Sequence, residues 1–186
     1  VAYMQEVEGW LNGEVNYLNL RGDTGPLVYP AAFLYIFAGL YYLTDCGRNI
    51  RMAQGIFAII YVVNLAIVMA IYGACSNQYQ DKDNMVNRTT RVTRSMATID
   101  ATASSEGLQS KSAPLWIWPL LVLSKRIHSI FVLRMFNDTI AVLFGYAAIL
   151  LFTKKRLRLG CILYSLGVGV KMNMLLYAPG VFLVLL

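Results

Sequence analysis

Three charged residues stand within the long apolar segments of this sequence. Arg134 and Asp138 interrupt the apolar run at 130–152, and Lys171 lies within the run at 159–176. An ionisable side chain costs several kcal/mol inside a bilayer, so each of the three is a candidate functional residue. A lysine and an arginine in a low dielectric can bind a phosphate through strong charge-assisted hydrogen bonds. A carboxylate beside them can bind a hydroxyl group or exchange a proton.

The spacing of these charges places them at one level of one membrane face. At 1.5 Å per residue, Asp138 would lie about 23 Å along a helix from Thr153, and Lys171 about 20 Å from Arg158. Arg134, which is one turn further out, and Asp138 are expected to pair on one helix face. A purely structural interpretation stays open: the pair could lock helix packing, and Lys171 could extend to the interface.

The stretch RGDTGPLVYP at 21–30 supplies further candidates immediately before a long apolar run. Its Gly-Pro pair and Pro30 prevent a continuous helix, since proline lacks a donor and restricts the residue before it. We therefore expect a rigid bend that holds Arg21 and Asp23 at a membrane surface, on the side of the three charges described above. A simple helix-entry turn is the alternative interpretation.

Glu6 is a candidate catalytic carboxylate near the start of the chain. Met4, Val7 and Leu11 recur at helical spacing, which predicts an amphipathic helix lying on the bilayer with its acidic face toward water. His128 follows two nearby basic residues and is a further candidate for phosphate binding. A single histidine is, however, more often structural than functional.

Composition identifies the elements that must position these residues as membrane helices. Hydrophobic residues make up 58% of the 186 and charged residues 14%, and no charge occurs at 24–44 or 52–80. Both stretches reach the roughly 20 residues that a membrane-spanning helix needs, and neither shows the alternation of a membrane β-strand. The sequence therefore predicts an all-α, polytopic membrane protein. Its spans are expected at 27–44, 56–75, 130–152 and 159–176, with another beginning at Val181.

This pattern predicts four segments. They are a lumenal loop with an amphipathic helix (1–26), two transmembrane helices (27–75), a polar and disordered loop (76–114), and a short or re-entrant segment plus at least two transmembrane helices (115–186). By the positive-inside rule, the basic cluster at 154–158 and the loop with Arg48 and Arg51 should be cytosolic, which places 1–26 on the other side. An Asn-Arg-Thr sequon at Asn87 is usable only if its loop is lumenal.

Several other classes of site are not indicated. The net charge of +6 is expected to reflect cytosolic flanks and anionic lipid headgroups, and nothing indicates nucleic-acid binding. The three cysteines are scattered and fit neither a metal site nor a disulfide framework, and no nucleotide-binding motif occurs. The sequence begins in mid-pattern at Val1 and ends on an apolar run, so we expect it to be a fragment.

Five blocks of the sequence resemble the dolichyl-phosphate-mannose-dependent α-1,3-mannosyltransferases of N-glycan precursor assembly. They are AYMQEVEG (2–9), GDTGPLVYP (22–30), NIRMAQ (49–54), RIHSIFVLRMFND (126–138) and VKMN (170–173). Any one block would be a weak signal. Together, in this order, they extend the resemblance over nearly the whole chain outside 76–114.

This resemblance implies part of a GT-C-type helical bundle that is multi-pass in the endoplasmic reticulum membrane. It implies transfer of mannose from dolichyl-phosphate mannose to Man5GlcNAc2 on dolichyl diphosphate, with an α-1,3 linkage and inversion at the transferred sugar. Such a transfer needs a general base and stabilisation of the departing phosphate. Dolichyl phosphate is a good leaving group, so no metal or cofactor is implied. The expected partners are the donor lipid, the acceptor lipid and membrane lipid.

The resemblance also implies roles for the candidate residues. Lys171, Arg134 and His128 are candidates for binding the donor phosphate. Asp23 and Glu6 are the candidate catalytic carboxylates, and the substrate-binding candidates are Arg21, Asp138, Asn137 and Asn173. The family's acidic cluster stands just before the first block, so the true base is expected upstream of Val1, with Asp23 as its substitute here.

Three other interpretations stay open. A transporter or channel would also carry charges inside its spans, but often with inverted repeats, and no repeat relates 27–75 to 130–176. A non-catalytic subunit of a glycosylation complex is compatible with a chain that lacks its expected base. A sibling transferase with another lipid-linked sugar or acceptor would share the fold, and only the five blocks argue against it.

Overall fold

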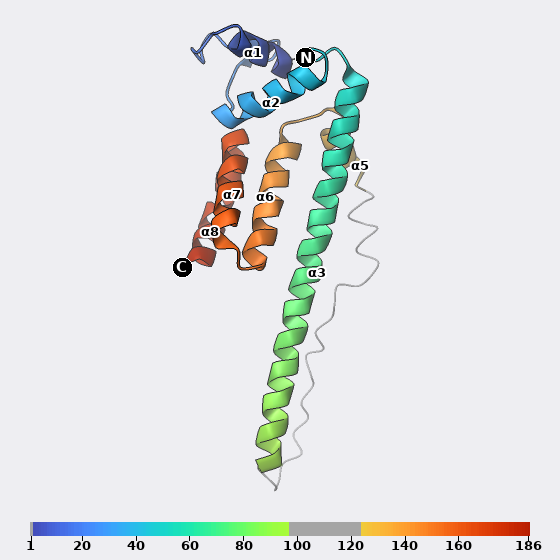
Figure 1. Ribbon diagram of the computed structural model, residues 1–186, viewed down its shortest axis with the longest axis vertical. Coiled ribbons are helices and arrows are strands. Elements are labelled where there is room, and N and C mark those ends of the chain that lie inside the picture. Colours follow the sequence, from blue (N-terminus) through green and yellow to red (C-terminus); the bar gives the residue numbers. More distant parts are fainter. Residues whose placement is uncertain (1, 97–123) are drawn as a thin grey trace.

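The computed structural model describes residues 2–96 and 124–186 and is mostly helical (Figure 1). Its helices are α1 (Ala2–Leu11), α2 (Ala31–Leu43), α3 (Ile50–Met96), α5 (Lys125–His128), α6 (Asp138–Thr153), α7 (Leu157–Val170) and α8 (Ala178–Leu185). A π-helix, η1 (Ser129–Leu133), precedes α6, and a 3₁₀-helix, η2 (Met172–Tyr177), precedes α8. The strands described, β1 (Arg21–Gly22) and β2 (Gly25–Pro26), have two residues each. The predicted all-α class is confirmed.

Within the described residues, α3 contains the one helical segment that is long and apolar enough to cross a membrane by itself. That segment, Ile50–Ser76, includes the predicted span at 56–75. The helix then continues to Met96, so the prediction of an irregular polar loop is wrong for 76–96. Neither glycine nor proline occurs between Gly73 and Met96, and without such residues a loss of apolar periodicity does not end a helix. The rest of that loop, and the re-entrant segment predicted from residue 115, lie outside the described residues.

The segment predicted as the first span, 27–44, contains a shorter helix. α2 has 13 residues, or about 20 Å of length at 1.5 Å per residue, and it lies across the ends of α6 and α7 (Figure 1). Pro30 directly precedes it, and left-handed backbone at Asp45 and Cys46 (φ 53° and 56°) turns the chain after it. A transmembrane course for this segment is therefore not confirmed.

α6 and α7 form a closely packed antiparallel pair (Figure 1). The turn between them passes through Lys155 in a left-handed conformation (φ 59°). Gly167 allows the close approach, because a Cβ there would come 3.3 Å from the carbonyl oxygen of Ala141. α7 ends where Lys171 becomes extended (φ −149°). The helical segment formed by α5 and η1 meets α6 at an angle of 111°, a bend that fits either a broken span or a re-entrant loop.

α1 packs against α2 through a cluster of aromatic side chains. Tyr3 makes edge-to-face contacts with Tyr29, Phe33 and Phe37, with ring centroids 5.4 to 5.7 Å apart. Phe33 and Phe37 are almost fully buried, and the same core continues into α7 through Val170. Burial of such large side chains is a main source of stabilisation. This core therefore holds the α1–α2 layer on the end of the α6–α7 pair.

Two basic segments that were expected on one side of the membrane lie at opposite ends of the structure. Gly47 lies against Met4 of α1, so the loop with Arg48 is at the end of the molecule that carries α1. The cluster at 154–158 lies at the far end of α6 and α7 (Figure 1). The predicted orientation required α2 to cross between the α1 layer and that loop, and α2 does not do so. The structure therefore does not confirm the prediction that both basic segments share one membrane face.

Candidate functional site

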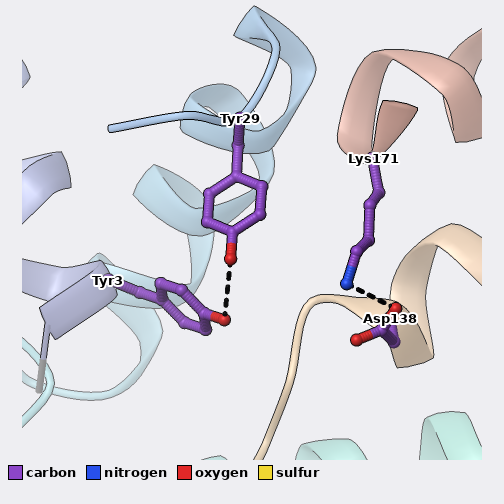
Figure 2. A network of polar contacts seen from close by, with 4 residues as sticks. All are labelled: Tyr3, Tyr29, Asp138 and Lys171. Carbon is purple, nitrogen blue, oxygen red and sulfur yellow. Dashed lines mark hydrogen bonds and ion pairs between the residues drawn. The ribbon is translucent and has the colours of Figure 1, made fainter. Parts of the chain in front are cut away.

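The antiparallel course of α6 and α7 brings two of the predicted charges together. Asp138 begins α6, Lys171 follows α7, and Lys171 Nζ lies 2.6 Å from Asp138 Oδ1 (Figure 2). The predicted pairing of Asp138 with Arg134 is wrong. It required one continuous helix, whereas η1 ends at Leu133 and the chain bends through Met135 (φ 49°). A cation and a carboxylate from two different helices thus form the centre of the candidate site.

Two phenol groups lie beside this ion pair. The hydroxyl oxygens of Tyr3 and Tyr29 are 3.4 Å apart. Figure 2 shows this tyrosine pair next to the Lys171–Asp138 ion pair. Burial, then the hydrogen bond with Tyr29 and the carboxylates of Asp138 and Glu6, raise the pKa of Tyr3 well above its usual range. Tyr3 therefore stays protonated near neutral pH and can donate a hydrogen bond to a phosphate or hydroxyl oxygen.

Glu6 is buried, although the sequence predicted that the acidic face of α1 would meet water. Glu6 is 3% exposed, whereas Glu8 is exposed. The packing of α1 against α2 and β1 accounts for the difference. Glu6 Oε2 has no hydrogen-bond partner in the part of the chain that the structure describes. Burial raises its pKa from 4.5 to about 6, which is closer to the neutral pH at which a general base works best.

The predicted bend begins with a β-hairpin that presents Asp23. Gln5 of α1 holds the hairpin twice: Gln5 Nε2 donates to Asp23 Oδ1 (3.0 Å), and Asp23 N donates to Gln5 Oε1 (2.9 Å). Arg21 is exposed, and its Nε donates to the carbonyl of Leu18 (3.1 Å). Asp23 is therefore at the surface and yet fixed relative to α1.

Arg134 lines a mostly apolar cavity of about 180 Å³ that is also lined by Tyr3. The walls come from α1, α2, the start of α3 and the bend before α6; they include Met4, Phe37, Thr44, Ile50, Phe57 and Met135. Arg134 is exposed and has no ion pair among residues 2–96 and 124–186. Its positive charge is therefore available to an anion that enters beside the cavity.

The remaining predicted residues are either apart from the ion pair or inside the protein. His128 contacts α3, where its Nδ1 lies 3.4 Å from the hydroxyl of Tyr61. Asn173 is exposed in η2. Asn137 is fully buried, and neither polar atom of its side chain has a partner among the described residues. The structure thus brings Lys171 to Asp138 but does not bring His128 to them.

Sequence reasoning missed several polar groups around these residues. Asn64 of α3 donates from Nδ2 to the carbonyl oxygen of Thr139 (3.1 Å), and both residues are buried. The available signal was an asparagine in the middle of an apolar span. Tyr3 and Tyr29 stand inside two of the resembling blocks, but only the fold brings their hydroxyls together.

The described residues contain no group of three or more His, Cys, Asp or Glu side chains that could hold a metal ion. The groups that they do bring together are cations, carboxylates and protonated phenols. Cations and phenols can bind a phosphate, and a carboxylate can accept a proton from a hydroxyl group.

Comparisons with known proteins match the whole chain. The family model described as ALG3 protein matches residues 1–96 and 96–186. A Drosophila melanogaster protein named dolichyl-P-Man:Man5GlcNAc2-PP-dolichol alpha-1,3-mannosyltransferase l(2)not2 is 47% identical over 98% of this chain. Proteins named Dol-P-Man:Man(5)GlcNAc(2)-PP-Dol alpha-1,3-mannosyltransferase are 46% identical in Neurospora crassa, over 99% of the chain, and 43% identical in Homo sapiens, over 100% of it.

The chain spans about a third of the length of these curated relatives, at 31%, 34% and 34% respectively. No solved structure matches it. The similarity therefore covers all of this chain and a minority of each relative.

Proposed function

The chain belongs to the ALG3 protein family, and on this premise we propose that it forms part of a dolichyl-phosphate-mannose-dependent α-1,3-mannosyltransferase. The proposed acceptor is Man5GlcNAc2-PP-dolichol, and the reaction inverts the transferred sugar. The family match over the whole chain is the observation that carries the proposal, and the names of the relatives supply the acceptor and the linkage. The donor is a substrate, and no cofactor is proposed.

We propose a multi-pass position in the endoplasmic reticulum membrane, within a GT-C-type bundle. The apolar part of α3 and the α6–α7 pair would lie in the bilayer. The basic turn after α6 would face the cytosol by the positive-inside rule, which places α1, the hairpin and α2 on the lumenal side. At that end α2 lies crosswise, packed against α1 and α7.

In this proposal, Arg134 is the best-placed residue to bind the donor phosphate. Its charge has no ion-pair partner in the described part of the chain, and it lines a cavity together with the protonated Tyr3. Lys171 is already paired with Asp138, so it attracts an anion less strongly, although its ammonium group keeps further donors. His128 is the weaker candidate, because Tyr61 lies against it.

Asp23 and Glu6 have different proposed roles. Asp23 is exposed and oriented by Gln5, so an acceptor hydroxyl can reach it as a base. Glu6 is ionised for the most part at neutral pH, but it is buried, and we assign it to tuning the charge around Tyr3. A base in the rest of the protein is the competing assignment. The other substrate-binding candidates are Arg21 and Asn173, which are exposed, and Asp138 and Asn137, which are held at the start of α6.

The test uses the full-length protein in cells that lack the family's mannosyltransferase. Dolichol-linked glycans would be profiled after expression of wild type, Asp23→Asn, Lys171→Ala and Arg134→Ala. We expect the wild type to clear the accumulated Man5 species, and the variants to leave it at normal protein levels, because each removes a proposed phosphate or proton contact.

Glu8→Gln is the matched control for Asp23→Asn, since Glu8 and Asp23 are both exposed carboxylates; it should clear the Man5 species like the wild type. A wild type that leaves this species untouched would contradict the transferase assignment. If all three variants clear the Man5 species like the wild type, the transferase assignment stands and the assignment of these residues to its site is wrong.

A further inference from the structure

The turn between α6 and α7 carries the densest positive charge of the chain. Its basic residues are Lys154, Lys155 and Arg156, Arg158 follows in the first turn of α7, and all four are exposed. None of them has an ion pair within the described residues. The sequence contains no Asp or Glu from residue 139 to residue 186. The turn therefore presents positive charge that its own helices do not compensate.

An open apolar groove begins beside this turn. It has a volume of about 390 Å³, and its walls include Cys75 of α3, Phe152 and Thr153 of α6, and Gly180 and Val184 of α8. Thr153 directly precedes Lys154 in the chain. A molecule lying in the groove would therefore have one end within reach of the basic turn.

The end of the apolar part of α3 sets the depth of this groove in a bilayer. That part ends at Ser76, one residue after Cys75, and Cys75 and Thr153 line the same groove. The first acidic residue further along α3 is Asp81, about 9 Å beyond Cys75 at 1.5 Å per residue. The basic turn thus stands at the level where α3 leaves the hydrocarbon, which is where lipid head groups lie.

We propose that this groove binds one acyl chain of an anionic phospholipid, whose head group contacts Lys154, Lys155 and Arg156. Charge complementarity argues for this occupant: ammonium and guanidinium groups bind phosphate through charge-assisted hydrogen bonds. Each basic residue near an anionic lipid surface raises the affinity about fivefold. The affinity for a zwitterionic lipid is not raised in this way, because its net charge is zero. The lipid site lies at the opposite end of α6 from Asp138, and it goes beyond the proposed transfer reaction.

Lipid binding to the purified full-length protein in detergent tests the charge contribution. Native mass spectrometry would compare phosphatidylserine with phosphatidylcholine of the same acyl chains. The wild type should bind phosphatidylserine more tightly. A Lys154→Gln/Lys155→Gln/Arg156→Gln variant should lose about 100-fold of the affinity for phosphatidylserine. Arg48→Gln/Arg51→Gln, at the opposite end of the structure, should lose none.

A second variant tests the groove without changing any charge. A Cβ at Gly180 meets no atom within 4 Å, so the phenyl ring of Gly180→Phe should fit into the groove and fill it. The affinity of this site for both lipids should then fall at least tenfold. Gly55→Phe in α3, where a Cβ also meets open space, should leave binding unchanged.

Three results would overturn the proposal. They are equal affinity of the wild type for the two lipids, wild-type affinity in either site variant, and displacement of phosphatidylserine by millimolar inorganic phosphate. The first two would indicate that another segment of the protein covers the groove or that the turn attracts lipids only diffusely. The third would indicate a site for free phosphate in place of a lipid.

Discussion

Lys171 and Asp138 meet from the ends of two different helices, and both side chains keep partial access to solvent, at 19% and 36% exposure. Ion pairs with this much solvent contribute about 1 kcal/mol or less. The N-terminal end of α6 also favours the negative charge of Asp138, which is its first residue. The contact is therefore more important for fixing the geometry of the candidate site than for the stability of the protein.

This contact should appear as coupling in a double-mutant cycle of thermal stability. Asp138→Asn and Lys171→Met are expected to couple by about 1 kcal/mol, because each substitution removes the partner of the other residue. A matched cycle of Asp138→Asn with Arg134→Met should be additive within about 0.3 kcal/mol, since the bend before α6 separates these two residues. Coupling in the second cycle and not in the first would contradict the structure.

Glu6 should make stability depend on pH between about 4.5 and 6. Burial raises its pKa from 4.5 to about 6, so the folded protein binds this proton more tightly than the unfolded chain. Stability is therefore lost as the pH rises through this window, by on the order of 2 kcal/mol. Thermal unfolding of wild type and Glu6→Gln across this range measures the effect. Glu6→Gln should not lose stability over this pH range, whereas the control Glu8→Gln should lose it like the wild type. Identical pH profiles of stability for wild type and Glu6→Gln would contradict the prediction.

The docking of the hairpin on α1 depends on the absence of a side chain at Gly22. A Cβ there would come 2.6 Å from the carbonyl oxygen of Ala2, and that oxygen belongs to the backbone and cannot easily move. Gly22→Ala should therefore lower the free energy of unfolding by about 1–3 kcal/mol. Gly55→Ala, at a position with open space, should raise it by up to about 1 kcal/mol. Thermal unfolding compares the two, and a neutral Gly22→Ala would mean that the hairpin does not dock on α1 as described.

The sequence was sufficient for elements whose cause is local. The length of the apolar run predicted the span within Ile50–Ser76, the prolines predicted the bend at 21–30, and helical spacing predicted α1. The occurrence of charge inside apolar segments also identified Lys171 and Asp138 as candidate site residues. These features depend on backbone chemistry and on the cost of burying charge.

Tertiary packing decided the features that the sequence did not predict. α2 is apolar but has only 13 residues, and its contacts with α1 and α7 hold it across the other helices. No glycine or proline marks the break between Leu133 and Asp138, so the four-residue spacing of Arg134 and Asp138 suggested a pairing that the bend prevents. Burial of Glu6 likewise comes from neighbours that are distant in sequence.

The whole molecule has two chemically different ends. The end that carries α1 holds the carboxylates, the phenols and the cavity beside Arg134, while the far end of α6 and α7 holds the exposed basic turn (Figure 1). Positively charged turns remain on the cytosolic side of membranes. The structure therefore predicts that the end with α1 faces the lumen, where the proposed transfer would occur.

Glycosylation mapping checks this orientation. Leu18→Ser creates an Asn-x-Ser sequon at Asn16, in the exposed loop after α1, and should add an endoglycosidase-sensitive glycan if that loop is lumenal. The natural sequon at Asn87 lies about 16 Å beyond Ser76 along α3, at the opposite end, so Asn87→Gln should not change the mobility of the protein. Labelling of Cys46, which is exposed near α1, gives a second measurement of the orientation. A membrane-impermeant maleimide should react with Cys46 only from the lumenal side. A glycan at Asn87, together with cytosolic labelling of Cys46, would reverse the orientation and place the candidate site on the face opposite to the one that the proposed reaction requires.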